Sequence, residues 1–546
     1  MKRFVGILVV LAVCLFASAR AESVHVCRAD GAGECVSMWE NRAGEKFLFL
    51  PAYMEGQTLE IQYEGYEGIR LGEMEIESGS QTDALEELAL VTEEGREKLN
   101  ILQSRNLPAV HLTTESGNLD YIHKKKGNRE KGTMLIVSPD GSTNYKGEAE
   151  YIKGHGNATF VYEKKSYQVK LQEKASVLGM GENKRFVLLA NQHENTFLRN
   201  RITFELAQAV GLPYTPECRN VDLYINGEYR GSYLLCDKVE VGSGSVAITD
   251  GEKAVEEANS QLVERGVTPQ AYGTQDYAKS THKGTAWPKE PEDVTGGYLF
   301  ELEYSQRYPD EKSGVVTKLG QPVVVKSPKE MTKAQGKYAA ALLNSFERAI
   351  FAPDGVDERS HLHYTEIADL DSLVRKYMIE EISKNYDANK SSQYFYKDSD
   401  SVDSFLYAGP VWDYDSAWGN YARKEKPEAA APEGLSVAHG GFKYSWWPAL
   451  ARQEDFAQAV RQTYEATFRP LLCVLTGEEK APEGCPLRSL DEYAEELGTS
   501  AEMNFARWDV LNHETRDIKT GKTYQENIEY LRGFIAARRT YLDSQW

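Results

Sequence analysis

The N-terminal part of the chain alternates apolar and polar positions. In residues 22–105, "EKFLFLPAYM" and "TLEIQYEGYEGIRL" show this period of two, which predicts short strands. The stretch "DALEELALVTEEGREKLNILQ" (83–103) then predicts a helix or a helical linker. We therefore expect residues 22–105 to form a small β-rich N-terminal module that ends in a helical linker.

The rest of the chain, residues 106–546, changes from strand patterns to helical ones. Asp140-Gly141 and Asn226-Gly227 are hairpin turns between alternating strands. The helical spacing of 195–214 ends at Gly211 and Pro213. Residues 251–295 are polar and predict a surface insertion, such as a lid, that is mobile rather than folded.

Beyond this insertion the pattern is mainly helical. Helices are expected over 333–351 and 369–385, strands over 393–398 and 404–415, and mostly helix to the end of the chain. A β-rich half followed by a largely helical half is typical of an α+β protein with two lobes.

Composition and charge narrow the classes of protein. A length of 546 residues favours two or three domains, and 41% hydrophobic residues supply a substantial core. The formal net charge is −20, and no block rich in lysine and arginine is present to neutralise phosphates. Nucleic acid is therefore not an expected partner.

The first residues have the pattern of a secretory signal peptide. Lys2 and Arg3 precede an apolar run, and the small-residue site Ala19-Arg20-Ala21 follows it. Residues 1–21 are thus expected to be removed, which predicts a secreted or cell-surface protein. The alternatives are a membrane anchor, although the run is shorter than the ~20 residues that span a bilayer, and lipidation at Cys14. No other stretch suggests an integral membrane protein.

Six cysteines remain after that cleavage, and they form three pairs that are close in sequence. In an exported protein, an even number with this spacing favours disulfides over metal ligation. The expected pairs are Cys27–Cys35, Cys218–Cys236 and Cys473–Cys485.

Two acids in "YAGPVWDYDSAWGN" (407–420) are the first candidates for chemistry. If the segment is extended, Asp413 and Asp415 share one face of the strand, and they repel each other unless a cation lies between them. Mg²⁺ suits such a site because it binds one or two carboxylates together with phosphate oxygens. The alternative is a turn in which the acids cap backbone amides.

Three further residues complete a possible phosphotransfer site. Asp387, on a loop after a helix, could orient an attacking hydroxyl, or it could simply be a residue of the turn. Lys170 lies on an alternating strand, and Glu205 on the next helix could pair with it; a solvent-exposed lysine is the alternative. The order of lysine, glutamate, aspartate and aspartate matches the division of labour in kinases.

At these residues the chain resembles the spore-coat protein H (CotH) kinase family. The resemblance covers roughly 107–545 and includes "YIKGHGNATF", "KKSYQVKLQEKASVLGM", "GGYLFELE", "NYD" and "GPVWDYDSAWGN". It implies a divergent two-lobed protein-kinase-like fold that uses ATP and Mg²⁺ or Mn²⁺ to phosphorylate protein hydroxyls. Lys170 would contact the ATP phosphates and Glu205 would pair with it. Asp387 would be catalytic, and Asp413 or Asp415 would ligate the metal.

The chain departs from that family at two positions. His155 replaces the usual arginine before Gly-Asn, and Ser392 and Gln393 lie where an asparagine ligand to a second metal is expected. The leading hypothesis is a secreted atypical kinase acting on Ser/Thr of an extracytoplasmic or surface protein. The alternatives are an inactive kinase-like adhesin or scaffold, with a wall, glycan or protein partner at the N-terminal module, and glycosyl or nucleotidyl transfer.

Overall fold

The structure is a computed structural model, which describes residues 22–83, 85, 88–273, 281–421, 426–511 and 521–546. The predicted signal peptide, 1–21, lies outside the described residues. Contacts between Cα atoms divide the described residues into two compact units: 22–50 with 54–102, and 51–53 with those from 103 to 546.

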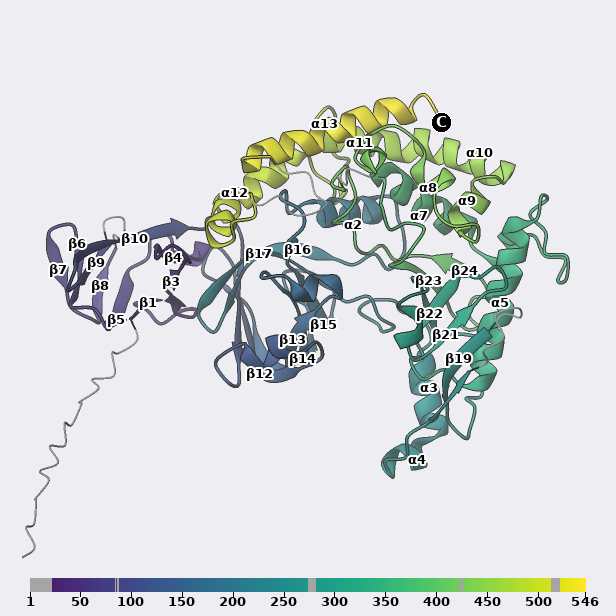
Figure 1. Cartoon of the computed structure of the whole chain (residues 1–546), viewed down its shortest axis with the longest axis horizontal. Coiled ribbons are helices and arrows are strands. Elements are labelled where there is room, and N and C mark those ends of the chain that lie inside the picture. The colour runs from purple at the N-terminus through teal and green to yellow at the C-terminus, as the bar shows by residue number, and fades with distance from the viewer. Residues whose placement is uncertain (1–21, 84, 86–87, 274–280, 422–425, 512–520) are drawn as a thin grey trace, which may run out of the picture. The chain divides into compact units, whose positions relative to one another are not determined.

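The first unit consists of antiparallel strands in two sheets, ordered β2-β1-β5-β8 and β3-β4-β10-β9-β6-β7 (Figure 1). The strands are β1 (Ser23–Arg28), β2 (Val36–Ser37), β3 (Trp39–Glu40), β4 (Lys46–Leu50), β5 (Leu59–Glu64), β6 (Gly68–Leu71), β7 (Met74–Ile76), β8 (Ser80–Thr82), β9 (Leu88–Thr92) and β10 (Gly95–Gln103). Cys27 and Cys35 form a disulfide within this unit, as expected.

The predicted helical linker is wrong. Residues 88–103 form the hairpin β9–β10, in which Gly95 pairs with Thr92 and turns the chain at a φ of +134°. "LALVT" shows the alternating burial of a strand, and Leu99 is the buried residue of β10. Pairing and burial within the sheet therefore outweigh the local preference of Glu, Leu and Lys for a helix.

The second unit begins with a closed barrel in the order β11-β12-β13-β14-β15-β17-β16. Its strands are β11 (Ala109–Thr114), β12 (Arg129–Val137), β13 (Thr143–His155), β14 (Ser166–Ala175), β15 (Asn183–Leu189), β16 (Cys218–Ile225) and β17 (Glu228–Asp237). Both predicted hairpin turns are confirmed, since β12 pairs with β13 and β16 with β17. Inward side chains such as Val169, Leu188 and Leu235 are fully buried in the barrel core.

A second sheet, ordered β18-β19-β21-β22-β20-β23-β24, follows along the chain. Its strands are β18 (Gln270–Gly273), β19 (Thr281–Ala286), β20 (Tyr298–Leu302), β21 (Gly314–Val316), β22 (Pro322–Ser327), β23 (Gln393–Lys397) and β24 (Leu406–Ala408). The insertion at 251–295 was expected to be mobile, but its described residues fold: α3 (Gly251–Ala258) and α4 (Ser260–Glu264) precede β18, and β19 pairs with β21.

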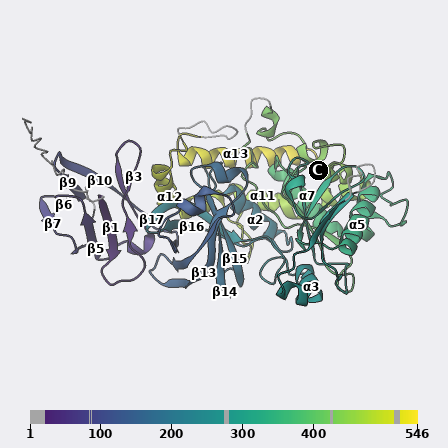
Figure 2. The same cartoon turned by 60° about the horizontal axis from the view of Figure 1, so that its bottom comes forward.

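Helices surround this second sheet and dominate the C-terminal part, as predicted (Figures 1 and 2). The α13 helix, yellow in Figure 1, runs beside α11, while Ser500 of α12 donates to Asp222 of β16 over 2.7 Å. The helices are α1 (Asp120–Lys124), α2 (Arg199–Ala209), α5 (Lys333–Phe351), α6 (Tyr364–Ile367), α7 (Leu370–Ser383), α8 (Ser436–His439), α9 (Trp446–Leu450), α10 (Glu454–Thr463), α11 (Arg469–Thr476), α12 (Leu490–Arg507) and α13 (Tyr524–Leu542). The α+β class is therefore confirmed, and the two-lobed kinase-like arrangement stays a prediction.

Two of the three expected disulfides are not formed. Cys218 and Cys236 oppose each other on β16 and β17, but both are free thiols, and Cys236 donates to the carbonyl of Val187 at 3.6 Å. Cys473 and Cys485 are also free, and the guanidinium of Arg539 lies 2.9 Å from the Cys473 sulfur. Proximity in sequence therefore identified only the pair in the small first unit.

Candidate active site

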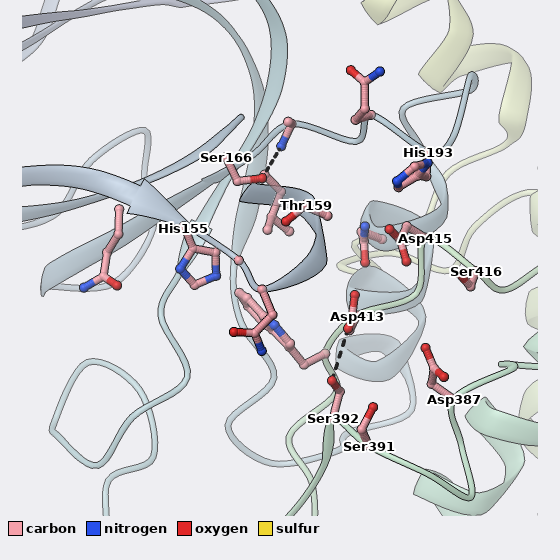
Figure 3. Close-up of a pocket in the computed structure, with 18 of the residues that line it drawn as sticks. His155, Thr159, Ser166, His193, Asp387, Ser391, Ser392, Asp413, Asp415 and Ser416 are labelled. Atoms are coloured by element: carbon pink, nitrogen blue, oxygen red, sulfur yellow. Dashed lines mark hydrogen bonds between the residues drawn. The ribbon is translucent and has the colours of Figure 1, made fainter. Parts of the chain in front are cut away.

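A cavity of about 860 Å³ lies in the second unit, and segments that are far apart in sequence line it. The barrel contributes the ends of β13 and β14 with the loop after β15. The second sheet contributes β20, β22 and the loops that follow α7 and β24. Figure 3 shows side chains from these segments pointing toward a common space.

Three predicted site residues lie in this cavity together: Asp387, Asp413 and Asp415 (Figure 3). Asp387 is on the loop between α7 and β23. The other two follow β24, which ends at Ala408, so the expected extended strand over 404–415 is wrong. Gly409, directly after β24, has a φ of +126° and ends the strand; Asp413 has a φ of +70° and is likewise not extended.

The segment that carries the acidic pair is held by hydrogen bonds to two helices. The backbone N–H of Tyr414 donates to the side chain of Asn200 on α2 at 2.8 Å. Trp418 is fully buried; its indole donates to Thr203 of α2 at 2.8 Å, and its backbone N–H to the carbonyl of Ser383 at the end of α7 at 2.6 Å. The aromatic residues that flank the acids therefore position the loop.

The acidic residues are not electrostatically compensated. Burial raises the pKa of Asp413 well above its usual range, and the charges of Asp415 and Asp387 raise it further. Burial also raises the pKa of Asp415 to about 6, with contributions from Asp387 and Glu194. A hydrogen bond of 3.1 Å from the Ser392 hydroxyl to Asp413 opposes this only in part. A bound cation would offset the repulsion.

Asp387 holds its position through two local contacts. Its backbone N–H donates to the side chain of Asn385 at 3.1 Å, and its carboxylate accepts a 2.9 Å hydrogen bond from the hydroxyl of Tyr304. Lys384, at a φ of +49°, ends α7 and turns the chain toward the cavity. Asp387 is therefore presented on a short, well-anchored loop.

Cations line the same cavity. Lys326 forms an ion pair with Glu301 at 3.0 Å, and Arg307 lies 3.7 Å from Glu303. The remaining two are Lys126, which donates to Asn157, and Lys153.

Lys153 is the cation best placed to receive an anion. It lies on β13, half-buried, with the ring of Tyr151 at 5.7 Å, and within the described residues it has no ion pair. Burial lowers its pKa, and the neighbouring charge of Lys238 lowers it further. An anion in the cavity would relieve this repulsion among cations.

The predicted pair of Lys170 and Glu205 is wrong. Lys170 forms an ion pair with Glu150 at 2.6 Å, and Glu205 pairs with Arg201 on its own helix at 3.0 Å; neither lines the cavity. Lys170 does share a strand face with Gln168, which lines the cavity, but it lies two residues farther along β14, away from the cavity. The residue opposite Gln168 on β13 is Lys153.

Sequence reasoning therefore missed Lys153 and Tyr304. Lys153 directly precedes the "GHGN" stretch, and Tyr304 directly follows "GGYLFELE", both of which carried the family resemblance. Only the strand register identifies the end of β13 that meets the cavity.

The donor set fits Mg²⁺ that binds together with phosphate. Within the described residues, no group of three His, Cys, Asp or Glu side chains is placed to hold a metal ion. Mg²⁺ usually takes one or two carboxylates and completes its octahedron with phosphate and water oxygens. Asp413 and Asp415 can supply the carboxylate ligands. Of the two residues in place of the expected asparagine, Ser392 lines the cavity and Gln393 is fully buried in β23.

Comparisons with known proteins show the family to which the chain belongs. None of the helices in the described residues is sufficiently long and apolar to traverse a membrane. No curated protein matches the sequence. The family model described as "CotH kinase protein" matches residues 152–542, which include the barrel strands from β14 onward, all the cavity-lining residues except Lys126 and Gly127, and the helices to α13. Because this match covers most of the chain, the protein belongs to the CotH kinase family.

Proposed function

We propose that this protein is an atypical protein kinase that transfers the γ-phosphate of ATP to Ser/Thr hydroxyls of a protein. The observation that carries the proposal is the convergence of Asp387, Asp413 and Asp415 in one cavity that also holds unneutralised positive charge at Lys153. Phosphoryl transfer needs this combination, since catalysis consists mainly of positioning and charge stabilisation.

Each residue has a role that follows from its surroundings. Asp387 would accept the proton of the acceptor hydroxyl, because its carboxylate already receives a hydroxyl hydrogen bond in the cavity. Asp413 and Asp415 would hold Mg²⁺ or Mn²⁺, which would neutralise charge on the transferred phosphate. Lys153, in place of Lys170, would bind phosphate oxygens. Ser392 would orient the Asp413 carboxylate.

The proposed acceptor is an extracytoplasmic or surface protein. This part of the proposal is supported by the leader pattern at 1–21 and by the disulfide Cys27–Cys35, since disulfides persist in oxidising compartments. The chain would therefore act where exported proteins meet nucleotide.

The test is transfer of labelled phosphate from ATP to casein by the purified protein, with Mg²⁺ or Mn²⁺. Asp387→Asn should lower the rate by about 10²–10⁴-fold, the usual contribution of a general base. Asp413→Asn and Asp415→Asn should abolish the metal-dependent transfer of phosphate. Asparagine is preferred to alanine at 413 because it tolerates a positive φ. The matched control is Asp371→Asn, an exposed aspartate on α7.

Two outcomes would refute the proposal. Wild type that binds no ATP in the presence of either metal would favour the alternative of a kinase-like adhesin or scaffold. Binding of a sugar nucleotide in place of ATP would favour glycosyl or nucleotidyl transfer through the same acidic pair.

A further inference from the structure

A tyrosine hydroxyl in the cavity already contacts Asp387, the proposed catalytic base. Tyr304 donates a 2.9 Å hydrogen bond to Asp387, and both side chains line the cavity with Asp413 and Asp415. Tyr304 lies just after β20, which ends at Leu302, and before a 3₁₀ turn at Tyr308–Asp310. Its backbone is therefore outside the strand ladder.

We propose that Tyr304 is a phosphoacceptor in cis, so that the protein phosphorylates its own active-site tyrosine. This inference rests on the proposed kinase function. In the reaction a bond forms between the Tyr304 oxygen and the γ-phosphorus of ATP, and the bond from that phosphorus to the β,γ-bridging oxygen breaks. The tyrosine proton passes to the Asp387 carboxylate, and ADP leaves.

The surroundings of the hydroxyl supply two groups that the reaction needs, a base and a cation. Burial and the charge of Asp387 raise the pKa of Tyr304, so the hydroxyl is neutral and reaction at its oxygen requires a base, which the hydrogen-bonded Asp387 carboxylate can supply. The guanidinium of Arg307 lies 5.2 Å from the Tyr304 ring and is exposed. It can neutralise the phosphate on the product, as arginine commonly does in phosphotyrosine sites.

Other tyrosines in the chain have the same local contact without the cavity. The hydroxyl of Tyr338 donates to Asp400 at 2.7 Å, and Tyr407 donates to Asp403 at 2.6 Å. None of these four residues lines the cavity. A hydrogen bond from tyrosine to aspartate is thus common here, and among the residues that the structure describes it coincides with the proposed metal and phosphate site only at Tyr304.

The experiment incubates the purified full-length protein with ATP and Mg²⁺ and maps phosphate by tandem mass spectrometry. Phosphate on Tyr304 is expected, with a rate per molecule that does not change when the protein is diluted. Tyr304→Phe should remove this phosphate, and the matched control Tyr338→Phe should keep it. Phosphate confined to serine, threonine or other tyrosines would overturn the inference, as would a rate proportional to protein concentration.

Casein in the same reaction separates the two proposals. Phosphorylated casein with unmodified Tyr304 leaves the kinase proposal intact and overturns the inference. If neither protein acquires phosphate in the presence of either metal, the kinase proposal fails.

A second measurement needs neither ATP nor metal. N-acetylimidazole transfers an acetyl group to tyrosine hydroxyls that can be reached, and peptide mapping locates the product. Tyr304 should be acetylated in wild type, which would show that an electrophile can approach its oxygen from the cavity. Failure to label Tyr304 while exposed tyrosines such as Tyr121 react would overturn the inference.

Discussion

Replacing Asp415 by asparagine should stabilise the metal-free protein at neutral pH while it destroys the proposed metal site. The folded protein raises the pKa of Asp415 from its ordinary 3.8 to about 6. This is a shift of about two units, and each unit corresponds to about 1.4 kcal/mol. Ionised Asp415 therefore costs the folded state up to roughly 3 kcal/mol, a cost that an uncharged amide avoids.

The sign of the pH dependence follows from the raised pKa. Below pH 3.8 the carboxyl is protonated in both the folded and the unfolded state, so ionisation contributes no difference. Between pH 3.8 and 6 the unfolded state loses its proton first, and wild type loses stability as the pH rises. The advantage of Asp415→Asn should thus grow through this range and be constant above it.

The assay is urea denaturation in EDTA at pH 4, 6 and 8. Asp371→Asn, on the exposed side of α7, is the control and should stay within about 0.5 kcal/mol of wild type. When EDTA is replaced by ATP and Mg²⁺, wild type should be stabilised and Asp415→Asn should not. An Asp415→Asn protein that is no more stable than wild type at pH 8 in EDTA would refute the electrostatic reasoning.

Three more predictions concern other parts of the molecule. Lys153→Met should weaken ATP binding roughly 10- to 100-fold by calorimetry, the value of one charged hydrogen bond, whereas Lys170→Met should not change it; equal effects would contradict the assignment. Replacing both Cys27 and Cys35 by serine should destabilise residues 22–102 by about 2–3 kcal/mol, because the unfolded chain is no longer restricted by the disulfide. Faster proteolysis of these residues would reveal the loss. Gly419→Ala should lower both stability and ATP binding, since its φ is +75° and a Cβ would lie 2.5 Å from an aromatic ring on α13; normal binding would show that α13 does not position the acidic loop.

The spacing of apolar residues predicted those helices and hairpins whose signals lie within one short stretch of sequence. The helices at 333–351 and 369–385 and both hairpin turns were found as expected. The hairpin β9–β10 was not, because glutamate, leucine and lysine favour a helix locally and only pairing with β6 and β4 makes these residues strands. Barrel closure, which pairs β11 with β16 in parallel, has no local signal at all.

For the candidate site too, residues with a local sequence signal could be predicted, and a residue placed by distant strand pairing could not. Asp387, Asp413 and Asp415 could be identified because each lies in a short segment with turn residues and aromatics around it. The proposed phosphate-binding lysine could not, because the choice between Lys170 and Lys153 depends on which end of two paired strands meets the cavity. Strand register is set by distant pairing and is therefore not readable from the spacing of one strand.

The two proposed metal ligands, Asp413 and Asp415, each lower the stability of the metal-free protein. Asp413 has a positive φ, a conformation that costs a non-glycine residue roughly 1–3 kcal/mol, and two residues later Asp415 adds an ionisation cost of similar size. Neither cost is needed for packing, since buried Tyr414 and Trp418 already anchor the loop to α2 and α7. A scaffold would be more stable with neutral side chains at both positions. Charge repulsion between neighbouring residues that face one cavity is instead expected of a site where a bound cation offsets it. This is the physical reason to test metal and ATP together.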